Sequence, residues 1–257
     1  MLGLFRSKKK KQMQKQPDLQ HTPVMLLGPK TPFVVTEAYK KIRTNLQFAV
    51  GASDAKLGNV IAISSCLPGE GKSVTSANLS IATAEISSKV LLIDADMRKP
   101  VQHKMFHIPN DKGLSTFLSG SSSLSEVVSQ GVRPGLDVIP AGPIPPNPSE
   151  LLATGNMQKL METASEIYDY ILIDTSPMDV VTDALIVSAK IAGLLMIVCP
   201  EICRHANLRR VMKDIELSET KILGTVVSNV YSDKSVLPIY KKKSYYNYKN
   251  YYSSKDE

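Results

Sequence analysis

Short, largely apolar segments that alternate with stretches of helical periodicity constrain the fold of this 257-residue chain more than any other feature. Segments without alternation of polar and apolar residues are typical of strands buried on both faces, as in parallel sheets covered by helices. The length suffices for one large domain, or at most two small ones. We therefore predict an α/β fold, a three-layer sandwich around a mostly parallel central sheet. The expected strands are Asn59–Ser64, Lys89–Asp94, Leu136–Pro140, Tyr170–Asp174, Leu194–Cys199 and Ile222–Asn229.

The segments between these strands predict the helices. Apolar residues recur at near-helical spacing after Thr36, a residue that can cap a helix, as far as Phe48. A second helix is expected from near Ser73 to Ala84. Further helical stretches are expected at 99–106, 113–119, 123–129, 149–154, 156–167, 179–189 and 204–217.

Composition excludes several classes of protein. The longest apolar run, Leu194–Cys199, is far shorter than the ~20 residues of a membrane-spanning helix. The first residues contain no apolar segment of signal-peptide length, so secretion by that route is not expected. The three cysteines, Cys66, Cys199 and Cys203, are too few for a disulfide scaffold and show no zinc-ligand spacing. This usage of cysteine favours a reducing cytoplasm.

The net charge of +7 lies in the two ends of the chain. Residues 1–15 carry +6 and residues 234–257 carry +4, which leaves −3 for residues 16–233. A nucleic-acid-binding protein usually has a basic face on its folded domain, so no nucleic-acid partner is expected. The basic N-terminal end either contacts anionic lipid, at about 1 kcal/mol per Lys or Arg near the surface, or is simply solvated.

A phosphate-binding loop joins the first expected strand to the helix after it. The segment ends in Gly-Lys-Ser, as in the P-loop G-x-x-x-x-G-K-[ST], although Cys66 stands where the first glycine is expected. Gly69 and Gly71 allow backbone N–H groups to turn towards phosphate oxygens. Lys72 supplies a cation for the β- and γ-phosphates, and Ser73 supplies a hydroxyl for Mg²⁺. The expected ligand is therefore ATP with Mg²⁺.

Carboxylates follow two of the other expected strands. Asp94 ends one strand with Asp96 just beyond it, and Asp174 ends another. Because ligands of open parallel sheets bind outside the carboxyl ends of the strands, these three side chains should converge with the P-loop. Mg²⁺ typically takes one or two carboxylates together with phosphates and water. One strand-end aspartate is often only a helix cap, but three beside a P-loop indicate a nucleotide and metal site.

Together these motifs resemble those of the bacterial tyrosine kinases, the family that regulates capsule and exopolysaccharide synthesis and export. The family's Walker A motif ends P-G-E-G-K-S, its Walker A′ motif is D-x-D-x-R and its Walker B motif is D-x-x-P. Here they match Pro68–Ser73, Asp94–Arg98 and Asp174–Pro177, and the likeness covers roughly residues 30–252. The resemblance implies an ATP-dependent protein-tyrosine kinase with a P-loop NTPase fold, related to the partitioning-type ATPases and not to the eukaryotic kinases.

The resemblance also implies roles for individual residues. Lys72 would hold the phosphates, while Ser73, Asp96 and Asp174 would hold Mg²⁺ directly or through water. Asp94 would be the base for the tyrosine hydroxyl, a role in which positioning matters more than basicity. The expected catalytic residues are therefore Lys72, Asp94, Asp96 and Asp174.

Two residues near the expected site keep alternative interpretations. Asn229, at a strand end, either reads adenine through its amide or is a turn residue. Arg98 either contacts phosphate or pairs at the surface. The expected nucleotide-binding residues are Pro68, Gly69, Glu70, Gly71, Lys72, Ser73, Val74 and Asn229.

Partners follow from the same resemblance. Glu37 would begin an E-x-x-R-x-x-R oligomerisation motif, in which Arg43 matches the second arginine and Lys40 replaces the first. Lysine keeps the charge but loses the bidentate fork, so ring-like assembly would be weaker or differently tuned. In the family's Gram-positive form, a separate transmembrane activator recruits the cytoplasmic kinase to the inner face of the membrane, and its cytoplasmic tail completes the nucleotide site. Protein tyrosine substrates and a partner tyrosine phosphatase are implied as well.

Tyrosines are concentrated at the C-terminal end. Six of the ten lie within residues 240–252, whereas residues 1–239 contain four. Disordered segments are usually poor in aromatics, so this enrichment needs a reason, unless the terminus merely happens to contain tyrosine. A flexible tail can place its tyrosines in a neighbouring protomer's site, which predicts autophosphorylation in trans. The expected sites are Tyr240, Tyr245, Tyr246, Tyr248, Tyr251 and Tyr252.

Two other functions stay open on the sequence alone. One is a partitioning-type ATPase, although Leu67 occupies the place of the signature lysine of those proteins. The other is a non-enzymatic ATP-binding scaffold of polysaccharide assembly, against which the intact Walker residues argue. We expect the chain to divide into a basic flexible arm (1–33), a P-loop kinase domain (34–230) and a flexible Tyr-rich tail (231–257).

Overall fold

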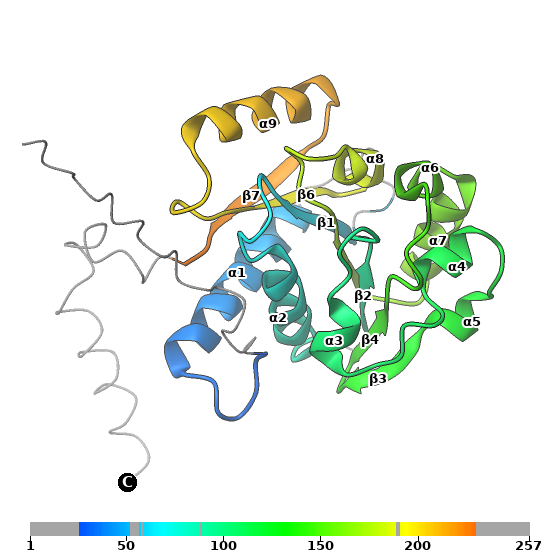
Figure 1. The fold of residues 1–257 in the computed structure, drawn as a ribbon. Helices are drawn as coiled ribbons and strands as arrows, with labels where there is room; N and C mark the ends of the chain where they lie inside the picture. Colours follow the sequence, from blue (N-terminus) through cyan, green and yellow to red (C-terminus); the bar gives the residue numbers. More distant parts are fainter. Residues whose placement is uncertain (1–25, 52–56, 58, 88, 189–190, 230–257) are drawn as a thin grey trace, which may run out of the picture.

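A computed structural model describes residues 26–51, 57, 59–87, 89–188 and 191–229. Seven strands form one sheet with helices on both faces (Figure 1). The strands are β1 (Val60–Ser65), β2 (Val90–Asp94), β3 (Ser129–Arg133), β4 (Leu136–Ile139), β5 (Tyr170–Asp174), β6 (Gly193–Val198) and β7 (Ile222–Val227). The helices are α1 (Phe33–Gly51), α2 (Lys72–Ala84), α3 (Gln102–Phe106), α4 (Leu114–Leu118), α5 (Leu124–Val127), α6 (Pro148–Leu152), α7 (Gly155–Ser165), α8 (Asp183–Ser188) and α9 (His205–Leu217).

The sheet is parallel except at one edge. Its strand order is β3-β4-β2-β5-β1-β6-β7, and only the β3–β4 pair is antiparallel. Five of the six expected strands are thus confirmed with nearly the expected bounds, and the sixth, β7, ends two residues early at Val227. The expected fold class, a mostly parallel sheet between helical layers, is confirmed.

The edge strand β3 was not predicted. Its segment begins where the expected helix 123–129 was to end, and that helix stops at Val127. The side chains of β3 are partly or fully exposed, so the strand carries no apolar run that the sequence could reveal. Its pairing with β4 follows a turn at Gly135, whose φ of 73° suits glycine.

Buried side chains of the central strands alternate between two cores. Val60 and Ala62 of β1 pack in one apolar cluster, and Ile61 and Ile63 pack in the other. The first cluster contains residues of α4 to α9, and the second contains residues of α1, α2 and α3, on the opposite side of the sheet (Figure 1). Because both faces are buried, these strands are apolar except at their carboxyl ends, which explains the runs seen in the sequence.

Several boundaries differ from the expected ones. Helix α1 begins at Phe33, ahead of Thr36, because the carbonyl of Pro32 already accepts N–H groups at the helix start. Helices α3 and α8 begin three or four residues later than expected. Leu27, placed in the arm by the sequence analysis, is 6% exposed, and its N–H donates to Asn78 Oδ1 at 2.7 Å.

The remainder of the expected arm and the whole Tyr-rich segment lie outside the described residues. The division of the chain at 33/34 and 230/231 therefore stays a prediction, as do the six tail tyrosines. Within the described ranges, no helix combines the length and the apolar character needed to cross a membrane.

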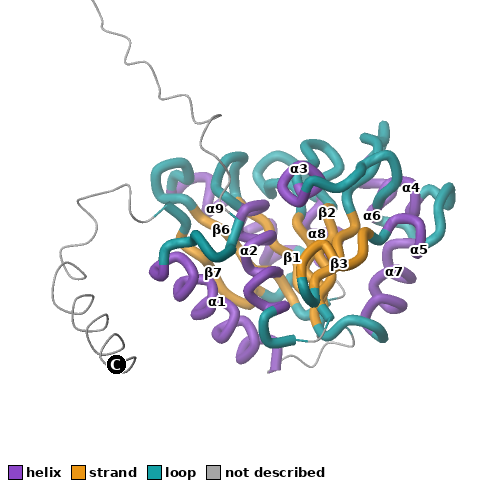
Figure 2. Tube along the Cα trace, turned by 90° about the horizontal axis from the view of Figure 1, so that it is seen from below, coloured by secondary structure: helices purple, strands orange, loops and turns teal. Residues whose placement is uncertain are grey.

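The carboxyl ends of β1, β5 and β2 meet at one edge of the sheet. Figure 2 shows loops gathered along this edge, with α3 among them. Strand β5 lies between the other two, and its register pairs Asp174 with Asp94 of β2 and with Ile63 of β1. The expected convergence of the P-loop with the strand-end carboxylates is thereby confirmed.

Candidate active site

The P-loop has the conformation that its glycines predict. Gly69 and Gly71 have φ angles of 86° and 89°, in the left-handed region. Gly71 directly precedes α2, which begins at Lys72. A Cβ at Gly71 would meet nothing closer than Ser228 Cβ at 3.9 Å, so backbone strain and not lack of space makes glycine necessary here.

Lys72 is held among oxygen atoms at the start of α2. Its Nζ lies 2.7 Å from Asp96 Oδ2, 3.5 Å from Asp174 Oδ1 and 3.0 Å from Ser73 Oγ. The residue is only 8% exposed. Burial by itself disfavours the ammonium, but Asp174 and Asp96 outweigh it and raise the pKa of Lys72. The site thus contains a fixed positive charge between two carboxylates.

Two residues that the sequence analysis did not select position these carboxylates. Gln102 donates from Nε2 to Asp174 Oδ2 at 2.9 Å and to the Ser73 carbonyl at 3.0 Å. Ser176 donates from Oγ to Asp96 Oδ1 at 2.9 Å. Ser176 lies inside the D-x-x-P motif and was therefore within reach of sequence reasoning, whereas nothing in the sequence marks Gln102.

Asp94 is, with Asp174, one of the two fully buried carboxylates of the site. It is 0% exposed, and its Oδ2 accepts the N–H groups of Val101 and Gln102 at 3.1 and 3.0 Å. Its Oδ1 has no hydrogen-bond partner among the described residues. Burial, reinforced by the charge of Asp174, raises the pKa of Asp94 from 3.8 to about 8.

The donor set is suited to Mg²⁺. Ser73, Asp96 and Asp174 supply a hydroxyl and two carboxylates around one ammonium. Hard oxygen ligands in small number, completed by phosphates and water, are what Mg²⁺ takes in nucleotide sites. These residues could therefore hold the metal of an ATP·Mg²⁺ complex.

Glu70, expected to bind nucleotide, directs its side chain into the protein. It is 1% exposed, with Oε2 accepting the N–H of Leu67 at 2.7 Å and Oε1 accepting the N–H of Cys199 at 3.0 Å. The hydroxyl of Ser228 donates to its carbonyl oxygen at 2.7 Å. The side chain thus fixes the P-loop against the end of β6, and only the backbone N–H is left to face a phosphate.

Arg98 and Asn229, whose roles were open, both make protein contacts. Arg98 Nε lies 2.9 Å from Asp183 Oδ2, and its Nη2 donates to Ser149 Oγ at 2.8 Å. Arg98 thus pairs with a buried carboxylate, and its contact with phosphate stays a prediction. Asn229 has a φ of 56° and donates from Nδ2 to Glu201 Oε2 at 2.8 Å. Its expected contact with adenine stays a prediction.

Removing the Arg98 guanidinium is expected to destabilise the protein. Asp183 is 0% exposed, and although burial alone would raise its pKa, Arg98 and Ser149 outweigh burial and lower it. Because Arg98 itself is partly exposed, we expect Arg98→Ala to cost about 2 kcal/mol of unfolding free energy at pH 7, measured by urea denaturation.

The pH dependence of stability distinguishes a loss of the Arg98–Asp183 ion pair from a loss of side-chain packing. A lowered carboxyl pKa stabilises the fold above the ordinary value of 3.8 and loses that contribution as the pH falls through the folded value. The difference between wild type and Arg98→Ala should therefore shrink below about pH 4. An equal deficit at pH 3 and pH 7 would contradict the electrostatic explanation.

The expected oligomerisation residues make contacts within the chain. Glu37 and Lys40 pair with each other on α1, with Oε1 and Nζ 2.9 Å apart. Arg43 donates from Nη1 to the carbonyl of Ala82 at 2.6 Å, near the C-terminal end of α2, and lies 3.7 Å from Glu85. Cations are favoured at this end of a helix. The role of these residues in assembly stays a prediction.

Fold and site together define a P-loop ATPase. The AAA domain family matches residues 58–223. The chain is 34% identical over 238 residues to the tyrosine-protein kinase YwqD of Bacillus subtilis, covering 93% of this chain and 94% of that protein. The chimerical protein CapA2B2 has a structure with a TM-score of 0.70 at 38% identity, covering 77% of this chain and 85% of that one.

The chain belongs to the bacterial tyrosine kinases, and it is an ATP-binding protein-tyrosine kinase. A plasmid partition protein from Borrelia burgdorferi matches with a TM-score of 0.56 at 21% identity, covering 72% of this chain and 87% of that one. At that level it shares only the fold. The expected relation to partitioning-type ATPases is thus confirmed as one of architecture, and the partitioning alternative for the function is only distant.

Proposed function

We propose that this kinase transfers the γ-phosphoryl group of ATP·Mg²⁺ to tyrosines of its own C-terminal segment in trans, and thereby regulates capsular or exopolysaccharide synthesis and export. The observation that carries the proposal is the buried Lys72 ammonium between Asp96 and Asp174, beside the Ser73 hydroxyl. Phosphoryl transfer depends mainly on positioned charge, which this cluster supplies.

In this proposal each Walker residue has one task. Lys72 binds the β- and γ-phosphates and offsets the negative charge of the transferred group. Ser73, Asp96 and Asp174 hold Mg²⁺, which neutralises charge on the phosphates when bound. Gln102 keeps Asp174 oriented towards the P-loop, since it bridges that carboxylate to the Ser73 carbonyl.

Asp94 accepts the proton of the tyrosine hydroxyl. Its Oδ1 has no partner among the described residues and is the atom available for that proton. A pKa near 8 makes its carboxylate a stronger base than an ordinary one. Because the side chain is 0% exposed, a tyrosine reaches it only if the surrounding chain shifts, including Val101 and Gln102, whose N–H groups donate to Asp94 Oδ2.

The tail would act through its charge. Residues 234–257 carry +4, and each phosphotyrosine adds about −1.5 to −2 charges at pH 7. Three modifications therefore invert the charge of the segment. An oligomer whose contacts formed with the unmodified tail would be loosened, which couples the chemistry to assembly.

A mixing experiment tests transfer in trans. A chain truncated after residue 231 keeps the whole active site but has no tail tyrosines, and full-length Lys72→Met keeps the tail but has no phosphate-binding cation. Incubated together with ATP and Mg²⁺, the mixture should place phosphate on the tail of the Lys72→Met chain, located by mass spectrometry. Full-length Lys72→Met alone should remain unmodified at 240–252.

The opposite pattern would contradict the proposal. Phosphate on wild-type tails but never on those of the mixture would mean transfer within one chain. An unmodified tail in wild type, even with the activator's cytoplasmic segment present, would exclude the tail as substrate. As a control, the circular dichroism spectrum of Lys72→Met should equal that of wild type, which shows that the acceptor chain is folded.

We further propose the partners that the family resemblance implies: a separate transmembrane activator whose cytoplasmic tail completes the site, a ring-like oligomer and a tyrosine phosphatase. Two large apolar side chains near the active-site edge support a protein partner there. Ile144 is 65% exposed in the loop after β4, and Val180 is 60% exposed in the loop after β5.

The double variant Ile144→Ser with Val180→Ser should abolish stimulation of kinase activity by the activator segment. Its unstimulated activity should stay within about twofold of wild type, because exposed apolar side chains contribute little to folding.

A further inference from the structure

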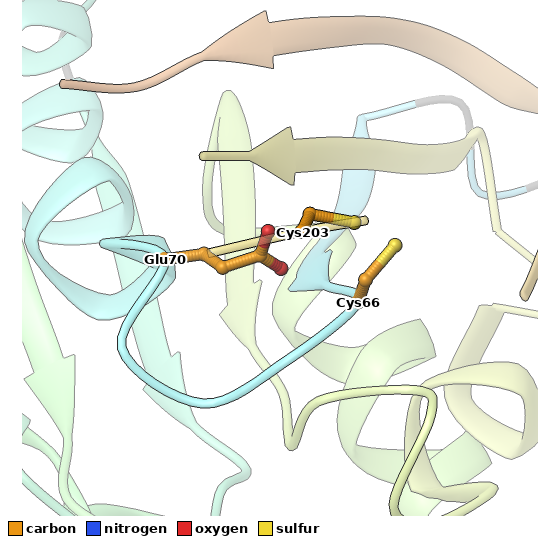
Figure 3. A group of neighbouring side chains, drawn as sticks. All are labelled: Cys66, Glu70 and Cys203. Carbon is orange, nitrogen blue, oxygen red and sulfur yellow. The ribbon is translucent and has the colours of Figure 1, made fainter. Parts of the chain in front are cut away.

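Three side chains from two separate segments meet behind the P-loop. Cys66 opens the loop, Glu70 lies within it, and Cys203 follows β6. Figure 3 shows the two Sγ atoms close together, with the Glu70 carboxylate directed towards them. Their two Sγ atoms and a carboxylate oxygen lie within 4.8 Å of one another. We infer that Cys66, Glu70 and Cys203 form a binding site for a zinc-type divalent cation, distinct from the Mg²⁺ site. The sequence could not show it, because the cysteines are too far apart in the chain for a zinc-ligand spacing.

The ligand chemistry favours a borderline-soft ion. Two thiolates with one carboxylate match the donors that Zn²⁺ takes at distances of about 2.0 to 2.3 Å, whereas Mg²⁺ avoids sulfur. Cys203 is only partly buried, so an ion and the water that would complete a tetrahedron can enter from its side.

Charge at this position also favours a cation. Glu70 is 1% exposed, and its carboxylate accepts two backbone N–H groups but forms no ion pair with a described residue. Asp179 also acts on the two cysteines, but its carboxylate is paired with Arg210 at 3.0 Å, so it is Glu70 that lacks a counter-charge among the described residues. A buried carboxylate without a counter-charge is costly, and a divalent ion would supply the missing charge. Each carboxylate oxygen has a further lone pair, so ligation need not break the two hydrogen bonds.

The binding step balances as an exchange of protons for metal. Burial raises the pKa of the Cys66 thiol, and also that of Cys203, so both sulfurs carry protons before the ion arrives. Two Sγ–H bonds break, both protons leave to solvent, and two sulfur–metal bonds form beside the Glu70 oxygen and a water. With Zn²⁺ the complex has a net charge of −1, and no oxidant or reductant takes part.

An ion bound here would connect the P-loop to the segment between β6 and α9. The two already touch, since the N–H of Cys199 donates to Glu70 Oε1 at 3.0 Å. Because the ion binds only the folded arrangement, it should raise the unfolding temperature of the protein. This readout is independent of kinase activity, so the inference can fail while the proposed function holds, and the reverse.

Cobalt titration of the full-length, reduced protein tests the site. With excess Mg²⁺ present to occupy oxygen-only sites, we expect one Co²⁺ per chain, an intense sulfur-to-cobalt charge-transfer absorption, and its loss when Zn²⁺ is added. The chain contains three cysteines, all of them described, so this absorption can arise only from Cys66, Cys199 or Cys203.

Alanine variants decide between them. Cys203→Ala should lower the cobalt affinity at least tenfold and remove the Zn²⁺-dependent rise in melting temperature. Cys199→Ala is the matched control, because that buried thiol lies outside the cluster, and it should bind like wild type. If Cys203→Ala is too unstable to titrate, Cys66→Ala replaces it and should show the same loss of cobalt affinity. A wild-type titration without charge-transfer absorption, or undiminished absorption in both cluster variants, would overturn the inference.

Discussion

Lys72→Met should abolish tyrosine phosphorylation and destabilise the protein at the same time. Loss of one positioned charge that stabilises the transferred phosphoryl group lowers rates by about 10²- to 10³-fold or more. The ammonium also compensates Asp96 and Asp174, which are 3% and 0% exposed. Removing one partner of a buried ion pair costs roughly 3 kcal/mol. Phosphotyrosine formation by mass spectrometry and urea denaturation at pH 7 measure the two effects.

Two comparisons keep these effects apart. Lys104→Met removes an exposed lysine on α3 and should change neither stability nor rate beyond small surface effects. Adding Asp96→Asn to Lys72→Met removes one uncompensated carboxylate, so stability should recover in part while activity does not. Phosphotyrosine that survives in Lys72→Met would refute the proposed site.

Much of the active site could be predicted because its chemistry lies at strand ends. Asp94 and Asp174 each end an apolar run. Ligands of open parallel sheets bind outside the carboxyl ends of the strands, which lie at one edge of the sheet. The adjacency of β1, β5 and β2 then brings both to the P-loop. Glu70 was predicted from its motif, but its inward side chain depends on the N–H of Cys199 in a strand end far along the chain. Contacts of that kind have no local signature.

The same distinction separates the expected strands from the missed one. The buried strands are visible in the sequence because they are apolar up to their carboxyl ends, whereas β3 is an edge strand held by backbone pairing with β4. Gln102 shows the limit for polar residues, because its 0% exposure and its two donated hydrogen bonds result from packing of α3 over α2. The Cys66–Glu70–Cys203 cluster likewise exists only once the loop after β6 lies on the P-loop.

Asp94→Asn should have the opposite effect on stability, producing a protein that is more stable but inactive. The pKa of Asp94 is raised from 3.8 to about 8, so the folded state binds this proton more tightly than the unfolded state does. The group's stabilising contribution is therefore fully present below about pH 4 and is lost as the pH rises towards 8. Asparagine keeps an oxygen to accept the N–H groups of Val101 and Gln102 but cannot ionise. The variant's advantage in urea denaturation should grow from near zero at pH 4 to roughly 5 kcal/mol at pH 8.

Lys72→Met should thus lose stability and Asp94→Asn should gain it, while both lose activity. This pattern is expected when a catalytic residue is kept for its chemistry at the expense of the stability of the fold. Asp111→Asn, at an exposed position, is the control and should show no such dependence on pH. If Asp94→Asn were less stable than wild type at pH 8, Asp94 would be an ionised anchor for α3 and not a strained acid. If the variant phosphorylated the tail at the wild-type rate, the tyrosine proton would have another acceptor, and the charge cluster around Lys72 alone would account for the transfer.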